Sequence, residues 1–190
     1  MAQIILASAS PRRKELLDQI GISYLVRAVN IDESVNPQES PLTYVQRIAA
    51  EKSAACLALY GTQLPILAAD TTVVLDDMIM GKPKDKDEAM HMLRLLSGRT
   101  HRVFTAVSLR GHEHWQTVNI TEVTFKTLTD QEIFNYWHTG EPQDKAGSYA
   151  IQGVGAMFVQ TIKGSFSGVV GLPLFETSQL LLKQGIQIYS

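Results

Sequence analysis

The amino-acid sequence predicts a mixed α/β fold with a central twisted sheet. In the first half of the chain, short runs rich in β-branched residues alternate with amphipathic stretches, as strands alternate with helices. Two longer strand-like runs then follow one another across Arg110 and Gly111, as in a β-hairpin. The 190 residues are 45% apolar, so the chain can bury a sizeable core. We expect one domain over residues 1–190.

Capping residues set the expected bounds of the helices. Ser10 with Pro11, and Ser40 with Pro41, are N-cap and first-turn pairs, and Gly61 ends the second helix. The expected elements, in chain order, are a strand over 3–8, a helix over 11–19, a strand over 23–29, a polar loop over 30–40, a helix over 41–60, a strand over 65–75, a loop over 79–87, a helix over 87–96, strands over 101–109 and 115–128, a helix over 129–139, a glycine-rich segment over 146–165 and a helix over 174–185.

Composition excludes several classes of protein. A net charge of −2 and a pI near 6.2 give no global reason to expect long nucleic acid or an anionic membrane as a partner. Cys56 is the only cysteine, which excludes an internal disulfide framework and a thiolate cage for zinc. No apolar run approaches the roughly 20 residues that span a bilayer. We expect a soluble cytoplasmic protein.

Familiar site patterns are missing from the sequence. It holds no Walker-type glycine loop ending in Lys-Ser or Lys-Thr, and no serine in a nucleophile-elbow pattern. The sequence GVGA at 153–156 is too short for a dinucleotide fingerprint. His112 and His114 fall at the expected hairpin turn and are interpreted as solvated surface residues. Any site must therefore be found from residues that break the pattern of the fold.

The first such feature is a cluster of cations at the start of the helix over 11–19. Arg12, Arg13 and Lys14 occupy its first turn. A helix start already exposes unpaired N–H groups and the positive end of the peptide dipole. Cations there are unfavourable unless an anion balances their charge, so we expect an anionic ligand at this turn.

Lys52 breaks the pattern of the helix over 41–60. It falls in register with an apolar stripe made of Val45, Ile48, Ala49, Cys56 and Leu59. One interpretation is a lysine stem lying on apolar surface with its ammonium in water. The other is that Lys52 points into a cleft that holds anionic oxygens.

Asp70 breaks the pattern of the strand over 65–75. An unpaired carboxylate is costly to bury, and the small residues Ala68 and Ala69 beside it leave space. An aspartate that ends a strand and accepts backbone N–H bonds is the structural alternative. Buried acids more often mark a functional site.

Two expected loops add further charges. Glu33 lies in one, and Lys82 with Lys84 lies in another, so none of them is committed to packing. Carboxylates that hold a divalent ion, together with cations that neutralise oxygens, are what phosphoryl chemistry requires. These residues therefore point to a site for a phosphorylated ligand.

Six blocks of the sequence carry a resemblance to known proteins: LASASPRRKELL, ESPLTYVQRIAAEKSAA, ILAADTTVVLDDMIMGKPKD, MLRLLSGRTHRVFTAV, DKAGSYAIQGVGAMFV and VVGLPL. In order and spacing they resemble the Maf family of nucleoside triphosphate pyrophosphatases. The resemblance covers nearly the whole chain. It implies an inosine-triphosphatase-like fold, with an elongated central twisted sheet, flanking helices and a cleft between two lobes, commonly assembled as a homodimer.

The resemblance also implies an activity and a set of residues. The activity is metal-assisted cleavage of a nucleoside triphosphate into its monophosphate and pyrophosphate. Asp70 matches the proton acceptor, and a divalent ion, Mg²⁺ or Mn²⁺, would be held by Glu33 and Asp70. The positions that line the phosphate and metal pocket are Ser8, Arg13, Glu33, Lys52 and Lys82.

Three positions carry base selection in this family. Here they are Arg12, Thr71 and Gln152, which resembles the branch that acts on dTTP and UTP. A sister branch acting on 7-methyl-GTP tends to carry tryptophan, glutamine and glutamate. A glutamine amide has a donor and an acceptor, so it can pair with the O4 and N3–H edge of uracil or thymine. The resemblance therefore implies a preference for pyrimidine nucleotides, normal or modified.

Two other functions stay open. One is a nucleotide-binding regulator that does not turn its ligand over, with the link to cell division that the resemblance implies. A buried carboxylate at Asp70 disfavours it unless a metal bridges acid and phosphate. The other is an RNA-binding adaptor that uses residues 12–14. Salt separates the adaptor from an enzyme, because binding to a phosphate backbone weakens steeply with ionic strength, whereas metal-dependent hydrolysis depends chiefly on the divalent ion.

Overall fold

A computed structural model describes residues 1–61 and 63–188 of the chain. Within this part the strands form one mixed sheet in the order β2-β1-β3-β5-β6-β7, with β4 paired to β3. Strand β1 runs parallel to β2 and β3, and the other pairs are antiparallel. The strands are β1 (Ile4–Leu6), β2 (Tyr24–Val26), β3 (Ile66–Leu75), β4 (Met78–Met80), β5 (Thr100–Arg110), β6 (His114–Phe125) and β7 (Val159–Lys163).

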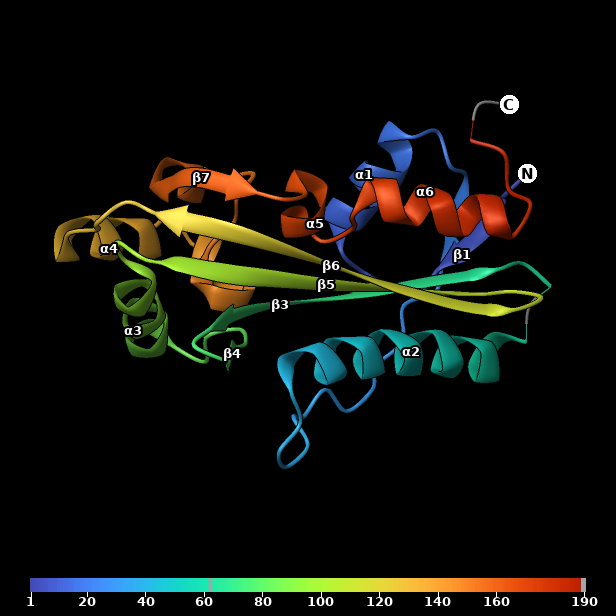
Figure 1. The fold of residues 1–190 in the computed structure, drawn as a ribbon, viewed down its shortest axis with the longest axis horizontal. Helices are drawn as coiled ribbons and strands as arrows, with labels where there is room; N and C mark the ends of the chain where they lie inside the picture. Colours follow the sequence, from blue (N-terminus) through green and yellow to red (C-terminus); the bar gives the residue numbers. More distant parts are fainter. Residues whose placement is uncertain (62, 189–190) are drawn as a thin grey trace.

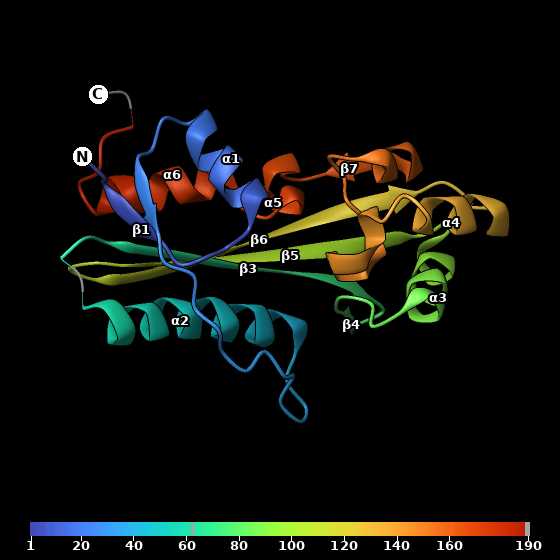
Figure 2. The same ribbon diagram turned by 180° about the vertical axis from the view of Figure 1, so that it is seen from behind.

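Helices cover both faces of the sheet. Figure 1 shows α2 on one face and α1 with α6 on the other, and Figure 2 shows the same layers from behind. The helices are α1 (Pro11–Gln19), α2 (Pro41–Tyr60), α3 (Lys86–Leu96), α4 (Asp130–Trp137), α5 (Phe166–Val170) and α6 (Leu174–Lys183), with short 3₁₀ turns η1 (Glu141–Asp144), η2 (Ala146–Ser148) and η3 (Val154–Phe158). None of the described helices is both long enough and apolar enough to cross a bilayer.

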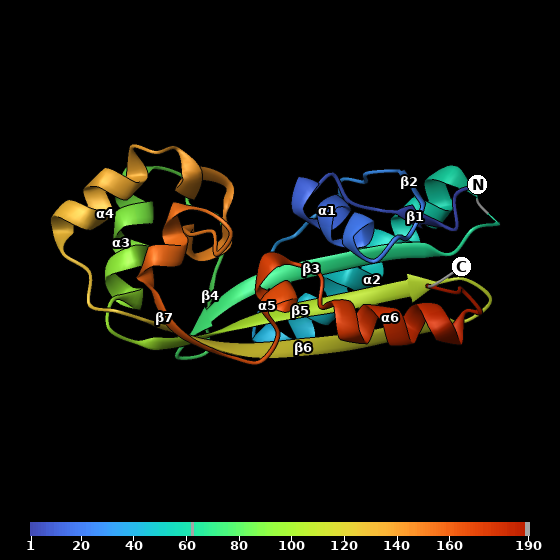
Figure 3. The same cartoon turned by 90° about the horizontal axis from the view of Figure 1, so that it is seen from above.

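The sheet is elongated and carries two lobes. Figure 3 shows β3, β5 and β6 running through both. One lobe holds β1, β2, α1, α2 and α6; the other holds α3, α4 and β7 at the far end of the long strands. The mixed α/β class and the elongated sheet predicted from the sequence are confirmed.

Strand β3 is buried on both faces and divides the core. Ile66, Ala68 and Val74 pack under α2, whereas Leu67 and Val73 belong to the larger cluster on the opposite side. Alternate residues of a strand point to opposite faces. This alternation therefore decides whether a residue of β3 packs on the face covered by α2 or on the opposite face.

Four expectations about the elements are wrong in detail. The strand over 23–29 shortens to Tyr24–Val26, because its partner β1 has only three residues. The loop expected over 79–87 begins inside β4, which forms a tight pairing with β3. Leu59 is 68% exposed, since the buried apolar clusters under α2 reach no further along the helix than Cys56. Ser10 occupies the N-cap position, but its side chain makes no capping hydrogen bond.

His101 is a buried histidine in the core of the sheet. Its Nε2 atom lies 2.8 Å from the Tyr149 hydroxyl, and its ring packs edge-on against Phe125. Its Nδ1 atom has no hydrogen-bond partner in the described part of the chain. Burial lowers the pKa of His101 from its usual 6.5 to about 4.

This depressed pKa predicts acid sensitivity. The unfolded chain takes up a proton at His101 near its ordinary pKa, so the stabilisation is present above pH 6.5 and is lost as pH falls toward 4. We expect this group to remove about 3 kcal/mol of unfolding free energy across that window. Urea denaturation of a His101→Gln variant should show a correspondingly flatter pH dependence. Equal slopes in the variant and in the wild-type protein would contradict the assignment.

Candidate active site

A cleft opens where one edge of β3 is left without a neighbouring strand. Strand β1 pairs with β3 only as far as Leu67, and β4 pairs with it only from Val73 onward. The edge of residues 68–72 lies between these pairings, and Asp70, Thr71 and Thr72 line a cleft of about 730 Å³ there. Because neighbouring residues point to opposite faces, Asp70 faces α2 and Thr71 faces α1.

Lys52 and Asp70 form a charged pair inside this cleft. The Lys52 Nζ atom lies 2.8 Å from Asp70 Oδ1 and 2.9 Å from Glu33 Oε1. The side chains of Lys52 and Asp70 are 12% and 8% exposed, while that of Glu33 is 49% exposed. Asp70 sits in the middle of β3, so it does not end a strand. The Lys52 ammonium is turned toward carboxylates. Lys52 and Asp70, the two residues that break the apolar patterns of their elements, therefore form an ion pair with each other.

The loop that carries Glu33 is held by α2. The Tyr44 hydroxyl donates to the backbone oxygen of Glu33 at 3.0 Å, and Arg47 donates to the backbone oxygen of Ser34 at 2.9 Å. Burial, followed by the negative charges of Asp70 and Glu33, raises the pKa of Tyr44 to about 12. Tyr44 therefore stays a hydrogen-bond donor, and the loop is anchored on the face of α2 that also bears Lys52.

Arg13 connects three segments on the opposite side of the cleft. Its Nε atom donates to the Gly171 backbone oxygen at 2.8 Å, Nη1 to Ser8 Oγ at 3.1 Å and Nη2 to Thr71 Oγ1 at 3.3 Å. Burial lowers the pKa of Arg13, and the charge of Asp70 opposes the shift. A guanidinium has five N–H donors, so two remain for an anion in the cleft.

Arg12 lies at the same helix start, and the charge of Asp144, in the 3₁₀ turn η1, acts on it. Burial lowers the pKa of Arg12, whereas the charges of Asp144 and Glu15 act in the other direction. Asp144 pairs with Lys145, and both line the cleft with Arg12. The cations at the start of α1 are thus partly balanced from within the protein.

The cleft residues missed from the sequence include Tyr44, Asp144, Lys145 and Tyr149. A charged pair placed directly before the glycine-rich segment is a signal that could have identified Asp144 and Lys145. Tyr44 and Tyr149 are buried aromatic residues, and no sequence pattern separates them from ordinary core tyrosines.

Comparison with known proteins now identifies the family. The family model described as "Maf-like protein" matches residues 3–184. The chain belongs to the Maf-like family.

Curated relatives of this Maf-like protein match over nearly their whole length. A protein of Pseudoalteromonas translucida (strain TAC 125) is 52% identical, with 94% of this chain and 95% of the relative covered, and it is named dTTP/UTP pyrophosphatase. A protein of Methylococcus capsulatus (strain ATCC 33009 / NCIMB 11132 / Bath) with the same name is 50% identical, with 97% and 92% covered. A protein of Escherichia coli O6:K15:H31 (strain 536 / UPEC), also so named, is 50% identical, with 95% and 92% covered.

A solved structure supports the fold. The HAM1 protein from Coxiella burnetii superposes on this Maf-like chain with a TM-score of 0.53 at 17% identity, covering 96% of this chain and all of the other. At this identity the likeness concerns the fold alone.

The structure brings most, though not all, of the expected site residues together in this Maf-like protein. Lys82 lines the cleft, is exposed and makes no hydrogen bond or ion pair within the described residues. Gln152 is exposed and does not line the cleft, although its neighbour Ile151 does. The residues that line the cleft as expected are Ser8, Arg12, Arg13, Glu33, Lys52, Asp70, Thr71 and Lys82.

The carboxylates suit a divalent ion only in combination with phosphate. Glu33 Oε1 and Asp70 Oδ1 converge on one point, now held by the Lys52 ammonium. The described residues contain no group of three or more His, Cys, Asp or Glu side chains arranged for a metal. Mg²⁺ is commonly held by one or two carboxylates plus substrate phosphates and water, so two acids meet its needs.

Proposed function

We propose that this protein hydrolyses dTTP and UTP to the nucleoside monophosphate and pyrophosphate. The chemical side of the proposal is carried by one observation, the contact of Lys52 with both Glu33 and Asp70 in a cleft that also contains Arg13. A buried acid beside several cations fits an anionic substrate that needs both proton transfer and charge neutralisation. The names of relatives about 50% identical to this chain support the choice of substrate.

In the proposed mechanism, Asp70 orients a water molecule toward the α-phosphorus and accepts its proton. The new bond joins the water oxygen to the α-phosphorus, and the bond from that phosphorus to the bridging oxygen breaks. Pyrophosphate leaves with the bonding electrons. Charge builds on the bridging oxygen, where the cations of Lys52, Arg13 and Lys82 act.

Arg13 has a second role in this mechanism. Its contacts with Ser8 and Thr71 fix the loop before α1 against β3. Residues 10–13 at the start of α1 thereby stay in the lining of the cleft, and a helix start favours phosphate. Arg13 thus orients the phosphate pocket and supplies charge to it.

Mg²⁺ or Mn²⁺ completes the proposed site. Glu33 and Asp70 would hold the ion together with phosphate oxygens, and the ion would supply charge neutralisation and acidify bound water. A carboxylate alone is a weak base at neutral pH, so this contribution matters for the reaction.

We propose that Gln152 reads the pyrimidine edge and that Arg12 and Thr71 contribute to base selection from the lining of the cleft. Its side chain forms no hydrogen bond with the described protein residues, so its amide is available for a base. Thr71 is committed to Arg13 and Thr105, at 3.3 and 3.0 Å, and acts by shaping the cleft. The homodimer implied by the family resemblance stays a prediction.

A nucleotide panel tests the proposed function. Purified protein is incubated with each common nucleoside triphosphate and Mg²⁺ or Mn²⁺, and pyrophosphate and monophosphate are measured. We expect turnover led by dTTP and UTP, and none when the divalent ion is chelated. Release of orthophosphate in place of pyrophosphate would contradict attack at the α-phosphorus.

The same assay separates the alternatives. Tight nucleotide binding without turnover would favour a regulator of cell division. Binding of RNA that weakens steeply with salt, again without turnover, would favour an adaptor. Either result would overturn the proposed enzyme.

A further inference from the structure

The turn that carries Gln152 is anchored from outside the cleft by a single carboxylate. Glu141 Oε2 accepts the backbone N–H of Val154 at 2.8 Å, and Glu141 Oε1 accepts that of Gly155 at 3.0 Å. Glu141 Oε1 also accepts the Tyr136 hydroxyl at 2.6 Å. Three donors from two segments therefore converge on one side chain.

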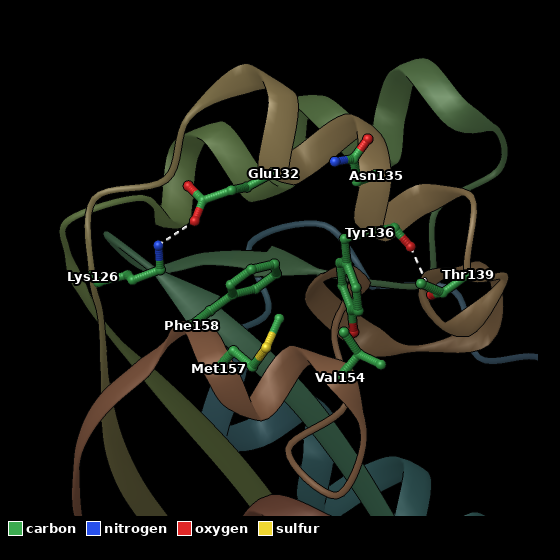
Figure 4. Close-up of a pocket in the computed structure, with 8 residues that line it drawn as sticks. All are labelled: Lys126, Glu132, Asn135, Tyr136, Thr139, Val154, Met157 and Phe158. Atoms are coloured by element: carbon green, nitrogen blue, oxygen red, sulfur yellow. Dashed lines mark hydrogen bonds and ion pairs between the residues drawn. The ribbon is translucent and has the colours of Figure 1, made fainter.

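Tyr136 extends this anchor to the other side of the turn. Its hydroxyl oxygen accepts the backbone N–H of Ala150 at 3.1 Å. Gln152 thus lies between one anchored residue, Ala150, and two others, Val154 and Gly155. Figure 4 shows the Tyr136 ring as one wall of a pocket of about 350 Å³, with its hydroxyl directed toward the segment of Val154.

The packing around Glu141 and Tyr136 leaves no room for a side chain at two glycines of the turn. A Cβ atom added at Gly153 would overlap the Glu141 carboxylate, and one added at Gly155 would lie 2.5 Å from the Tyr136 hydroxyl. Burial alone would raise the pKa of Glu141, but the hydrogen bonds from Tyr136, Gly155 and Val154 outweigh it and lower the pKa. Glu141 is therefore a carboxylate at neutral pH and serves as an acceptor only.

We propose that Glu141 is a positioning residue for base selection: with Tyr136, it holds the turn of residues 150–155 in the shape that presents Gln152 to the pyrimidine. This inference rests on the proposed function, because it assumes that Gln152 reads the base. Glu141 does not line the cleft and touches none of the proposed catalytic residues.

A Glu141→Gln variant tests the inference. The amide keeps the size of the side chain but presents an NH₂ group to one of the N–H donors, so the turn loses an acceptor. The readout is the ratio of kcat/KM for dTTP to that for dCTP, since cytosine reverses the donor and acceptor at the edge proposed for Gln152. We expect this ratio to fall about tenfold, through a higher KM for dTTP with kcat little changed.

A double-mutant cycle separates positioning from general damage. In a Gln152→Ala background the ratio has already fallen, and Glu141→Gln should lower it no further. Glu132→Gln is the matched control, since Glu132 accepts the backbone N–H of Thr129 and, among the described residues, makes no hydrogen bond or ion pair with residues 150–155. It should leave the ratio unchanged. If Glu141→Gln does not fold, Tyr136→Phe keeps the ring and should lower the ratio about threefold through the lost hydroxyl.

The outcomes distinguish this inference from the proposed function. A wild-type protein that releases no pyrophosphate from any nucleotide would overturn both. A wild-type protein that prefers dTTP, with an unchanged ratio in Glu141→Gln and in Tyr136→Phe, would overturn the positioning role alone. So would a further fall of the ratio in the Gln152→Ala background, because Glu141 would then act independently of Gln152.

Discussion

Replacing Asp70 with Asn is expected to lower kcat for dTTP by about 10²- to 10⁴-fold, which is the usual contribution of a general base. The amide has nearly the same shape but cannot take a proton from water, and it is a poorer ligand for Mg²⁺ or Mn²⁺. Lys52 keeps Glu33 as a charged partner at 2.9 Å, so the fold should persist. Pyrophosphate release measures the loss of kcat, and urea denaturation measures whether the fold persists.

The matched control is Asp76→Asn, at the residue that directly follows β3. Asp76 pairs with Arg99 at the surface, with its side chain 72% exposed, and it lies outside the cleft. Its φ of 48° is one that asparagine adopts well. This variant should turn over dTTP at the wild-type rate, whereas near-normal turnover by Asp70→Asn would remove Asp70 from the mechanism.

Replacing Lys52 with Met is expected to damage both stability and activity. Asp70 would be left buried without its counter-charge, and breaking a buried ion pair in this way costs about 3–5 kcal/mol of unfolding free energy. Loss of a cation from the phosphate pocket should lower kcat/KM by about 100-fold. Urea denaturation and steady-state kinetics with dTTP measure the two effects.

A second variant shows whether the unpaired charge causes the instability. Adding Asp70→Asn to Lys52→Met removes the uncompensated carboxylate, so the double variant should regain much of the lost stability while staying inactive. Lys163→Met is the surface control, because its contact with Glu122 is long, at 3.6 Å, and exposed. It should change stability by no more than about 0.5 kcal/mol. Unchanged stability in Lys52→Met would contradict the structural part of this account.

The sequence predicted the long elements better than the short ones. Helix α2 matches its expected bounds, because Ser40, Pro41 and Gly61 are local signals that act through neighbouring backbone groups. Strand β4 and helix α5 have three and five residues, too few for a periodic pattern to emerge. The position of β4 depends on its pairing with residues 73–75 of β3, and that of α5 depends on packing against β5 and β6.

The candidate site was only partly predictable for the same reason. Asp70 and Lys52 could be singled out because each breaks a regular apolar pattern. Tyr44 could not, because its role lies in one hydroxyl that reaches the backbone of Glu33. Glu141 lies shortly before the glycine-rich segment, yet nothing local shows that its carboxylate accepts hydrogen bonds from three donors.

By itself the sequence determined which charges are out of place, because helix and strand periodicity are properties of neighbouring residues. It also determined the family, since its ordered blocks match the Maf-like model over residues 3–184. Only the tertiary structure decided that Lys52 and Asp70 meet at 2.8 Å and that Gln152 lies beside the cleft lining. The first contact joins α2 to the middle of β3, and the second depends on the turn that Glu141 and Tyr136 hold. Both require segments that are separated along the chain to pack together, and no local pattern of residues specifies that packing.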